Sequence, residues 1–355
     1  MEPVVLTLIS YDLEVCSDDG RRLQVNVAGA ADGYPVFLMH GTPGSRRGPR
    51  PRGIVLHRLG VRLVSYDRPG YGRSDRAEGR TVTDAAHDVI TIARASGIDE
   101  FAVVGRSGGG PHALAVAALH PERVSSVAVL VSLAPYNAGG LDWFDGMNEH
   151  NVREFMAVDD ETDPHFDDIL QWAEATGRDP QHMIDVLRPD LCEFDHRVVG
   201  DVALRRLLLD TYREGLRQGP GGWIDDVLAF RRPWGFELSD IRVRTLLWHG
   251  ANDHFSPVEH SHWLHGQMTG GPTPAELHIQ PGIGHFGAVE VLPDVLSWIV
   301  DGVSPVERSA YSSRRRSAAE PPWAGLLTAA SAHNGAAPAA ARHCSAGDRS
   351  GPRRR

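Results

Sequence analysis

The sequence contains no lysine: all 36 residues in the lysine and arginine count are arginines, and 46 acidic residues outnumber them, so the net charge is −10. Nucleic-acid phosphates are bound by a basic face, and an acidic average argues against such a face. We therefore expect no nucleic-acid partner for the body of the protein. A small organic substrate without charge fits this composition better.

Cysteine is scarce, and long apolar runs are absent. The three cysteines, Cys16, Cys192 and Cys344, are odd in number and far apart, which excludes a disulfide framework and a CxxC metal site. No basic segment followed by an apolar run opens the sequence, and no stretch approaches the roughly 18 apolar residues that a membrane span needs. We expect a cytoplasmic protein with no membrane association.

Short apolar runs alternate with longer helical patterns over most of the chain. Three strand-like segments separated by turns occupy the first 41 residues. Further apolar runs follow at 62–66, 101–105, 127–132, 245–249 and 276–280, and helices are predicted near 82–96, 108–119, 257–268 and 288–300. This alternation is typical of parallel strands joined by crossover helices, so the sequence predicts an α/β core around a buried sheet.

The alternation is interrupted once and ends before the end of the chain. We predict a core in two parts, 1–134 and 239–302, with a mostly helical cap at 135–238 inserted between them. From 303 to 355, serine, alanine, proline, glycine and arginine dominate, which predicts a disordered tail. Nine arginines and three acidic residues give this tail a charge of +6 and leave −16 for the rest. It either touches RNA or acidic surfaces, or it is an unselected or frameshifted extension.

A G-x-S-x-G motif, Gly105 to Gly109, stands where an apolar strand meets a predicted helix, which is the context that a nucleophilic serine requires. The backbone at Ser107 is strained in such a turn, and side chains at the two flanking positions would collide, so both are glycine. Arg106 fits because its position is able to point away from the serine. A plain glycine-rich connection is the alternative, whereas the glycine spacing does not suit a dinucleotide site.

A serine hydroxyl needs a base, and the base needs an acid to orient it. Asp253 follows one apolar strand in "LLWHGANDHFSP", and His285 follows the next in "LHIQPGIGHFGAVE". Loops at the carboxyl ends of parallel strands converge in space, which predicts a triad of Ser107, Asp253 and His285. The competing histidines are His249, His254, His260, His262 and His265, and the last three lie along one predicted helix. We interpret that helix as a solvated face rather than a metal site, because no acidic or cysteine ligand completes the set.

Two backbone amides are candidates for an oxyanion hole. The N–H of Gly108 lies at the start of the helix after the serine, and the N–H of Thr42 lies in "FLMHGTPGS", where an earlier strand ends. Pro43 has no N–H to donate. The alternative is a tight turn that Gly41 and Gly44 stabilise.

With these residues identified, the chain resembles the α/β-hydrolase superfamily over about residues 15–302. The matching segments are "HGTPGS", "YDRPGYGRSD" at 66–75, "GRSGGG", "LLWHGANDHFSP" and "GIGHF", in the order that the family has them. The resemblance implies a mostly parallel, eight-stranded sheet with helices on both faces, the Ser107–Asp253–His285 triad and a helical cap. It also implies a structural role for the loop at 67–75, with Arg68 and Asp75 tying neighbouring loops.

The G-x-S-x-G turn, which we call the elbow, carries serine at its centre. This disfavours halide cleavage and epoxide opening, because members of the superfamily with those activities carry aspartate there. We expect a serine hydrolase that cleaves a carboxylic ester, or a related acyl bond, of a small molecule through an acyl-enzyme, without a cofactor or metal. The alternatives are a proline iminopeptidase-like aminopeptidase and a triad-bearing ligand sensor.

The cap is expected to determine which substrate the site accepts. Trp143, Phe144 and Met147 are predicted as apolar walls of the substrate site, although packing between cap helices explains them equally well. The acidic run from Asp159 to Asp168 either receives a substrate amine or is simply solvated. The sequence does not indicate an oligomeric state.

Overall fold

The structure is a computed structural model of the chain that describes residues 7–157, 164–270 and 273–302. The predicted tail at 303–355 lies outside the described residues, as do Asp159, Asp160, Glu161 and Asp163. Of the remaining predicted acidic run, Asp167 is exposed.

Among the described residues eight strands form one sheet, and each segment predicted as a strand overlaps one of them. The order across the sheet is β1-β2-β4-β3-β5-β6-β7-β8. β2 pairs antiparallel with both β1 and β4, and all other neighbours are parallel. The predicted eight-stranded, mostly parallel sheet is therefore confirmed. The strands are β1 (Leu8–Cys16), β2 (Arg22–Ala30), β3 (Tyr34–Met39), β4 (Val61–Tyr66), β5 (Phe101–Arg106), β6 (Val124–Leu130), β7 (Arg244–Gly250) and β8 (Glu276–Gln280).

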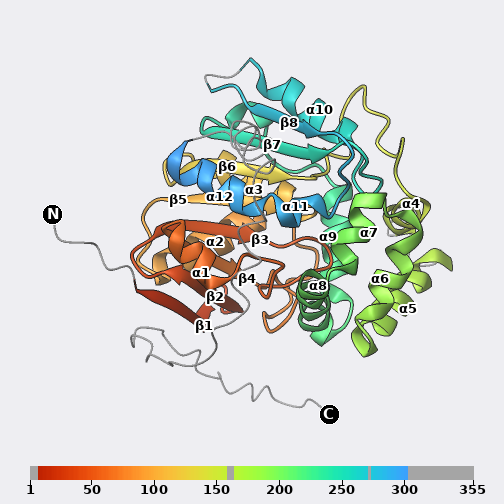
Figure 1. The fold of residues 1–355 in the computed structure, drawn as a ribbon, viewed down its shortest axis with the longest axis horizontal. Helices are drawn as coiled ribbons and strands as arrows, with labels where there is room; N and C mark the ends of the chain where they lie inside the picture. Colours follow the sequence, from red (N-terminus) through yellow and green to blue (C-terminus); the bar gives the residue numbers. More distant parts are fainter. Residues whose placement is uncertain (1–6, 158–163, 271–272, 303–355) are drawn as a thin grey trace, which may run out of the picture.

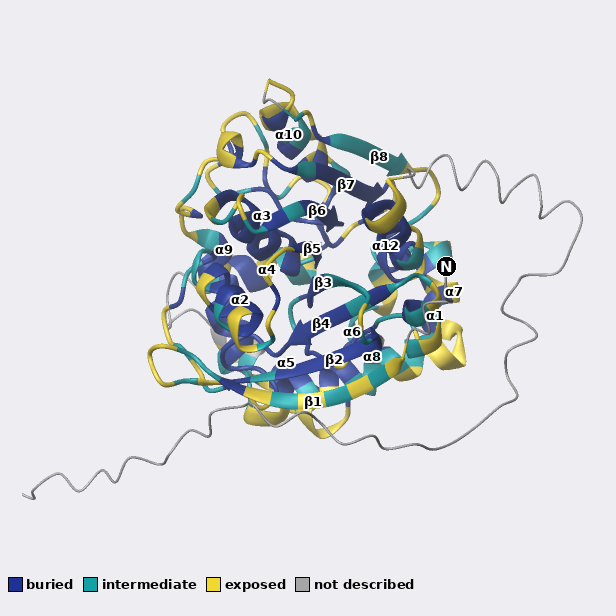
Figure 2. Ribbon diagram, turned by 90° about the vertical axis from the view of Figure 1, so that its left-hand side faces the viewer, coloured by how far each residue is buried: buried dark blue, intermediate teal, exposed yellow. Residues whose placement is uncertain are grey.

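Helices cover both faces of the sheet (Figures 1 and 2). One face carries α1 (Gly53–Arg58), α11 (Gly287–Glu290) and α12 (Leu292–Asp301), and the other carries α2 (Asp84–Ala95), α3 (Gly109–Leu119) and α10 (Val258–Met268). Successive side chains of a strand point to opposite faces, so Val103 of β5 packs with the second group and Val104 with the first. Both faces are apolar, which is why the central strands read as continuous apolar runs.

Six α-helices lie between β6 and β7 and gather at one side of the sheet (Figure 1). We call them the cap helices: α4 (Glu149–Ala157), α5 (Pro164–Arg178), α6 (Gln181–Leu187), α7 (Glu193–Gly200), α8 (Val202–Gly215) and α9 (Gly221–Arg231). They fall within the segment that the sequence predicts to be a helical cap. The division of the chain into core, cap and tail remains our proposal.

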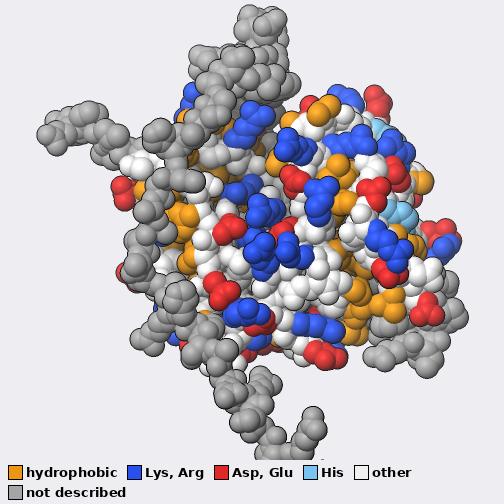
Figure 3. Space-filling view, turned by 90° about the horizontal axis from the view of Figure 1, so that it is seen from below, with side chains coloured by type: hydrophobic (Ala, Val, Ile, Leu, Met, Phe, Trp, Pro, Cys, Tyr) orange, Lys and Arg blue, Asp and Glu red, His pale blue; other side chains and the backbone are white. Residues whose placement is uncertain are grey.

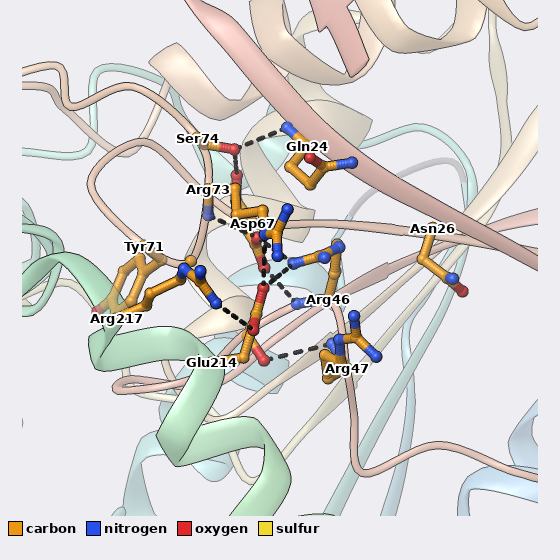
Figure 4. A network of polar contacts seen from close by, with 12 residues as sticks. Gln24, Asn26, Arg46, Arg47, Asp67, Tyr71, Arg73, Ser74, Glu214 and Arg217 are labelled. Carbon is orange, nitrogen blue, oxygen red and sulfur yellow. Dashed lines mark hydrogen bonds and ion pairs between the residues drawn. The ribbon is translucent and has the colours of Figure 1, made fainter. Parts of the chain in front are cut away.

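A buried ion network joins the cap to the core (Figure 4). Arg46, in the loop after β3, is 1% exposed and bonds Asp67 at 2.6 Å and Glu214 of α8 at 2.7 Å. Asp67 also accepts the backbone N–H groups of Arg46 and Arg73 at 2.8 and 3.1 Å. Burial raises the pKa of Asp67 to about 6, against the opposing charge of Arg46. Removing one partner would leave a buried charge uncompensated, so this network fixes α8 against two core loops.

Positive and negative side chains are interleaved on the face of the molecule that Figure 3 shows. Within residues 7–157, 164–270 and 273–302, the helices are all too short or too polar to cross a membrane.

Candidate active site

Ser107 adopts a backbone conformation that non-glycine residues rarely take. It lies between β5 and α3 with a φ of 52°, in the left-handed region. Its N–H donates to Leu130 O at 2.8 Å, and its carbonyl accepts the N–H of Gly110 at 2.8 Å. Such a conformation costs on the order of 1 kcal/mol or more and persists only where surrounding structure enforces it. The strained turn predicted from the G-x-S-x-G motif is present.

The glycines beside Ser107 are required by close approach. A Cβ on Gly105 would lie 2.4 Å from Gly109 O, and a Cβ on Gly109 would lie 2.3 Å from Met39 O. Both contacts are with backbone atoms, which cannot move aside as a flexible side chain does. The turn therefore packs so tightly against β3 and its own helix that no larger residue fits at either flank.

Asp253 and His285 come together as predicted, from the loops after β7 and β8. His285 Nδ1 lies 2.7 Å from Asp253 Oδ2. Asp253 is 4% exposed, and its Oδ1 accepts the N–H groups of Phe255 and Ser256 at 2.8 and 3.1 Å. Burial alone would raise the pKa of Asp253, but the charge of His285 and the hydrogen bonds of His249 and His285 outweigh burial and lower this pKa below its usual range. The carboxylate is thus ionised and fixed beside the imidazole.

His249 supports Asp253 at the same carboxylate oxygen that His285 contacts. Its Nε2 lies 2.6 Å from Ser256 O and 3.2 Å from Asp253 Oδ2, and its Nδ1 lies 2.6 Å from Ser261 Oγ. A carbonyl oxygen only accepts, so Nε2 carries the proton and Nδ1 accepts from the hydroxyl. His249 is fully buried and has a structural role, whereas the second histidine that flanks Asp253, His254, is exposed.

Ser107 and His285 line the same pocket, which encloses about 680 Å³ of empty space, part of it open to solvent. Within the described part of the chain no hydrogen bond joins Ser107 Oγ to His285. Because Nδ1 is bonded to Asp253, Nε2 is the ring nitrogen left for the serine. Catalytic hydrogen bonds of this kind are often long before substrate binds. The complete serine–histidine–aspartate line remains a prediction.

The predicted oxyanion groups lie beside each other. A Cβ on Gly108 would lie 2.3 Å from Thr42 Oγ1, so the start of α3 presses against the loop after β3. Neither the Gly108 N–H nor the Thr42 N–H donates a hydrogen bond within the described residues, which leaves both available to a ligand. Thr42 lines the pocket with Ser107. The arrangement is compatible with the predicted role, which stays a prediction.

A buried carboxylate that sequence reasoning missed holds the Thr42 loop. Asp226 of α9 is fully buried and accepts from Thr42 Oγ1 at 2.6 Å, from Arg68 at 2.5 Å and from Tyr71 OH at 2.8 Å. Arg80 at 2.5 Å and His112 Nε2 at 3.2 Å complete its surroundings. We call these six residues the Asp226 cluster. Burial alone would raise the pKa of Asp226, but the two arginines hold it well below its usual range.

Arg68 and Asp75 tie loops together, as the resemblance implies. Besides binding Asp226, Arg68 donates to the carbonyls of His40 and Gly41, the latter at 3.0 Å. Asp75 binds Arg22 at the start of β2 at 2.7 Å. Both residues are therefore structural in this fold, and Arg68 acts directly on the loop that carries Thr42.

Three of the loops of the site are each held by a different cap helix. Asp226 of α9 binds the Thr42 loop. Asn151 of α4 donates to Phe255 O, beside Asp253, at 2.9 Å. Asp195 of α7 accepts the N–H of Phe286, beside His285, at 2.9 Å. The cap therefore fixes the geometry of the site as well as covering it.

The structure corrects the prediction of apolar walls. Trp143, Phe144 and Met147 do not line the pocket. Trp143 is 5% exposed, donates its Nε1 to Ala134 O at 2.9 Å and packs edge-on against Phe144 and Phe155. Met147 is buried in the same apolar core. The three residues lie at the turn before α4, and Trp143 packs between Phe155 of α4 and His260 of α10.

Other residues line the pocket in their place. Several polar side chains come from the cap helices, and no motif distinguishes them in the sequence beyond the i, i+4 spacing of His150 and Glu154 on α4. Arg106, for which the sequence predicts an orientation away from the serine, also lines the pocket, and burial lowers its pKa to about 10. The cap residues of the lining are His150, Asn151, Glu154, Met183, Leu187, Leu208, Tyr212 and Trp223.

The histidines of α10 differ in their surroundings, and the interpretation of a solvated face is wrong for His260. His260 is buried, accepts the N–H of Ala134 at 2.9 Å through Nδ1 and donates to Trp143 O at 3.0 Å. Burial lowers its pKa to about 4. His262 is exposed. The part of the chain that the structure describes contains no group of three histidine, cysteine or acidic side chains placed to hold a metal ion.

Comparison with known proteins places the chain among hydrolases. A 2-hydroxy-6-oxononadienedioate/2-hydroxy-6-oxononatrienedioate hydrolase of Klebsiella pneumoniae is 26% identical over 284 residues, 77% of this chain and 88% of the relative. A bifunctional esterase/perhydrolase of Acinetobacter calcoaceticus is 26% identical over 253 residues, 69% of this chain and 83% of the relative. A proline iminopeptidase of Neisseria gonorrhoeae is 36% identical over 105 residues, 29% of this chain and only 34% of the relative.

The fold has close counterparts among solved structures. The enol-lactonase of Burkholderia xenovorans superimposes with a TM-score of 0.60 at 18% identity, over 81% of this chain and 98% of that one. The sequence profile described as "alpha/beta hydrolase fold" matches residues 34–290. Because that match spans most of the chain and includes the elbow, Asp253 and His285, this protein belongs to the α/β-hydrolase family.

Proposed function

We propose that the protein is a serine hydrolase that cleaves a carboxylic ester of a small molecule through an acyl-enzyme. The observation that carries this proposal is the 2.7 Å contact between His285 Nδ1 and the buried carboxylate of Asp253, in a pocket that strained Ser107 also lines. The match to an esterase/perhydrolase over most of its length supports the ester as the substrate.

The proposed mechanism begins with proton transfer from Ser107 Oγ to His285 Nε2, as Oγ attacks the ester carbonyl carbon. Asp253 orients the imidazole and stabilises the imidazolium that forms. The N–H groups of Thr42 and Gly108 would bind the tetrahedral oxyanion, and removing one such donor typically costs on the order of 10²–10³ in rate.

Breakdown of this intermediate breaks the bond between the carbonyl carbon and the alcohol oxygen. The proton held by His285 passes to the departing alkoxide, which leaves as an alcohol. Water then gives its proton to His285 and attacks the acyl-enzyme, and Ser107 is released with its hydroxyl restored as the carboxylic acid departs.

Steady-state hydrolysis of p-nitrophenyl acetate and butyrate tests this proposal. We expect turnover by the wild-type protein and a loss of at least about 10³-fold in kcat for Ser107→Ala. Full hydrolysis by that variant would reject the proposal. Labelling of the wild type by a fluorophosphonate, without turnover of any ester in a broad panel, would favour a ligand sensor instead.

An aminopeptidase is the second candidate, and the partial match to a proline iminopeptidase favours it. Amides and esters are attacked by the same triad and differ in the leaving group. Faster release of p-nitroaniline from proline p-nitroanilide than of p-nitrophenol from short acyl esters would favour the aminopeptidase over the esterase.

The partner that we propose is a small acyl substrate. The cytoplasmic location expected from the scarcity of cysteine stays a prediction, as does the lack of nucleic-acid and membrane partners.

A further inference from the structure

Glu154 is a buried carboxyl group in the pocket of the proposed nucleophile. It is 7% exposed, belongs to α4 and lines the pocket together with Ser107 and His285. Trp223 Nε1 of α9 donates to Glu154 Oε1 at 2.6 Å. Within the described residues no hydrogen bond reaches Oε2, and no arginine pairs with this carboxyl group. One oxygen is therefore left for a ligand.

Both helices that hold Glu154 are fastened to the site. Asn148, just before α4, donates through Nδ2 to His254 O at 3.0 Å, and Asn151 donates to Phe255 O at 2.9 Å, so α4 is tied to the loop of Asp253. α9 carries Trp223 and is tied to the Thr42 loop through Asp226. The position of Glu154 relative to the proposed reacting atoms is thus fixed before substrate arrives.

The surroundings of Glu154 differ from those of Asp67 and Asp226, two buried carboxylates that serve structure. Asp67 and Asp226 are each paired with arginine. Burial raises the pKa of Glu154 to about 7, and the hydrogen bond from Trp223 offsets this only in part. The titratable groups that line the pocket with it are His150, Arg106, Tyr212 and His285. A carboxylate left unpaired in such a pocket destabilises the free protein, which is typical of a group retained for function.

We propose that Glu154 binds a protonated amine on the acyl side of the substrate, so that the preferred substrates are esters or amides whose acyl group carries a free amino group. This rests on the function proposed above. An ammonium group supplies both the positive charge and the N–H donor that the free oxygen of Glu154 lacks, whereas a substrate carboxylate would meet like charge. The proposed amine lies on the acyl group, so the same preference is expected whether the leaving group is the alcohol of an ester or the amine of an amide.

A matched set of methyl esters tests this inference: methyl propionate, L-alanine methyl ester, N-acetyl-L-alanine methyl ester and monomethyl succinate, followed by pH-stat titration at pH 7, where most of the α-amino group is protonated. The wild type should prefer the alanine ester to the propionate and the acetylated ester. In Glu154→Gln, which keeps an oxygen for Trp223, the ratio of kcat/KM for the alanine ester to that for propionate should fall about 10- to 100-fold, the size expected for a charged hydrogen bond.

Glu149→Gln is the control, because Glu149 lies on the same helix, is 83% exposed and pairs with Arg153. It should leave that ratio within about twofold of the wild type, as surface pairs contribute little. Glu154→Met, of similar length and apolar, is a second variant if the first folds poorly, and it should lower the ratio at least as far.

The outcomes separate the two proposals. An equal fall in kcat/KM for all four esters in Glu154→Gln would overturn the inference, because it would mean a structural role. A wild-type preference for monomethyl succinate over the alanine ester would also overturn it. In either case, continued dependence of hydrolysis on Ser107 would leave the proposed function standing, whereas full activity of Ser107→Ala would reject that function itself.

Discussion

Replacing Asp226 by asparagine tests whether the cap holds the site through one buried charge. Asp226 lies 2.5 Å from both Arg68 and Arg80, whose side chains are 1% and 3% exposed. Asparagine keeps the shape and removes the charge, so the two guanidinium groups keep only backbone carbonyls and neutral groups as partners and remain buried without a negative charge beside them. Breaking a buried pair in this way costs about 3–5 kcal/mol, a large part of a typical stability of about 5–15 kcal/mol.

Urea unfolding followed by circular dichroism measures this loss, and Asp225→Asn is the control. Asp225 is the neighbouring residue of α9 and binds Arg76 at 2.8 Å, but Arg76 is 43% exposed and would be solvated after the change. We expect Asp225→Asn to cost about 1 kcal/mol or less. The pKa of Asp226 is held well below its usual range, so its contribution is fully present at neutral pH and is lost only as the pH falls through that low value.

Activity provides an independent readout of the same variant. Asp226 fixes Thr42 Oγ1, so Asp226→Asn should lower kcat for p-nitrophenyl butyrate even where the variant is fully folded, while Asp225→Asn should not. Equal destabilisation by the two variants, or a loss below about 1 kcal/mol for Asp226→Asn, would refute the argument from buried charge.

Three further predictions concern the site. Gly108→Ala places a Cβ 2.3 Å from Thr42 Oγ1, so kcat for p-nitrophenyl esters should fall on the order of 10²–10³-fold, and an active variant would show that the oxyanion is bound elsewhere. Asp253→Asn should lower kcat on the order of 10⁴-fold with little change in KM, and a KM effect alone would contradict the role given to His285. The pKa of Glu154 is raised from 4.5 to about 7, so the folded protein retains a proton that the unfolded chain releases. Between pH 5 and 8 the free energy of unfolding of the wild type should therefore fall by about 2.5 kcal/mol relative to that of Glu154→Gln. Urea unfolding at both pH values measures this, and a constant difference between the two proteins would contradict it.

The sheet and the elbow could be predicted because their signals are local. Buried parallel strands are short apolar runs, and the predicted 276–280 coincides with β8, while 62–66 misses the start of β4 by one residue. The G-x-S-x-G motif requires glycine because backbone atoms approach within one turn. Asp253 and His285 follow from topology, since both end parallel strands at the same sheet edge.

The cap side of the site could not be predicted because its contacts depend on how helices pack. Thr42 and Asp226 are 184 residues apart in sequence, and no spacing links them. Trp143 lies in a turn before α4, and its apolar character alone does not say whether it lines a pocket or packs in a core. The uncharged substrate expected from the net charge stays a prediction, because an average over the whole chain does not show which charged side chains, such as Glu154, line the pocket.

Peptide mapping after reaction with a fluorophosphonate tests the central claim, that the Asp253–His285 pair activates Ser107. Mass spectrometry should find one phosphonyl group per chain, on Ser107, and His285→Ala should slow its attachment by at least about 10³-fold. Attachment to another residue, or an equal rate in His285→Ala, would contradict the account.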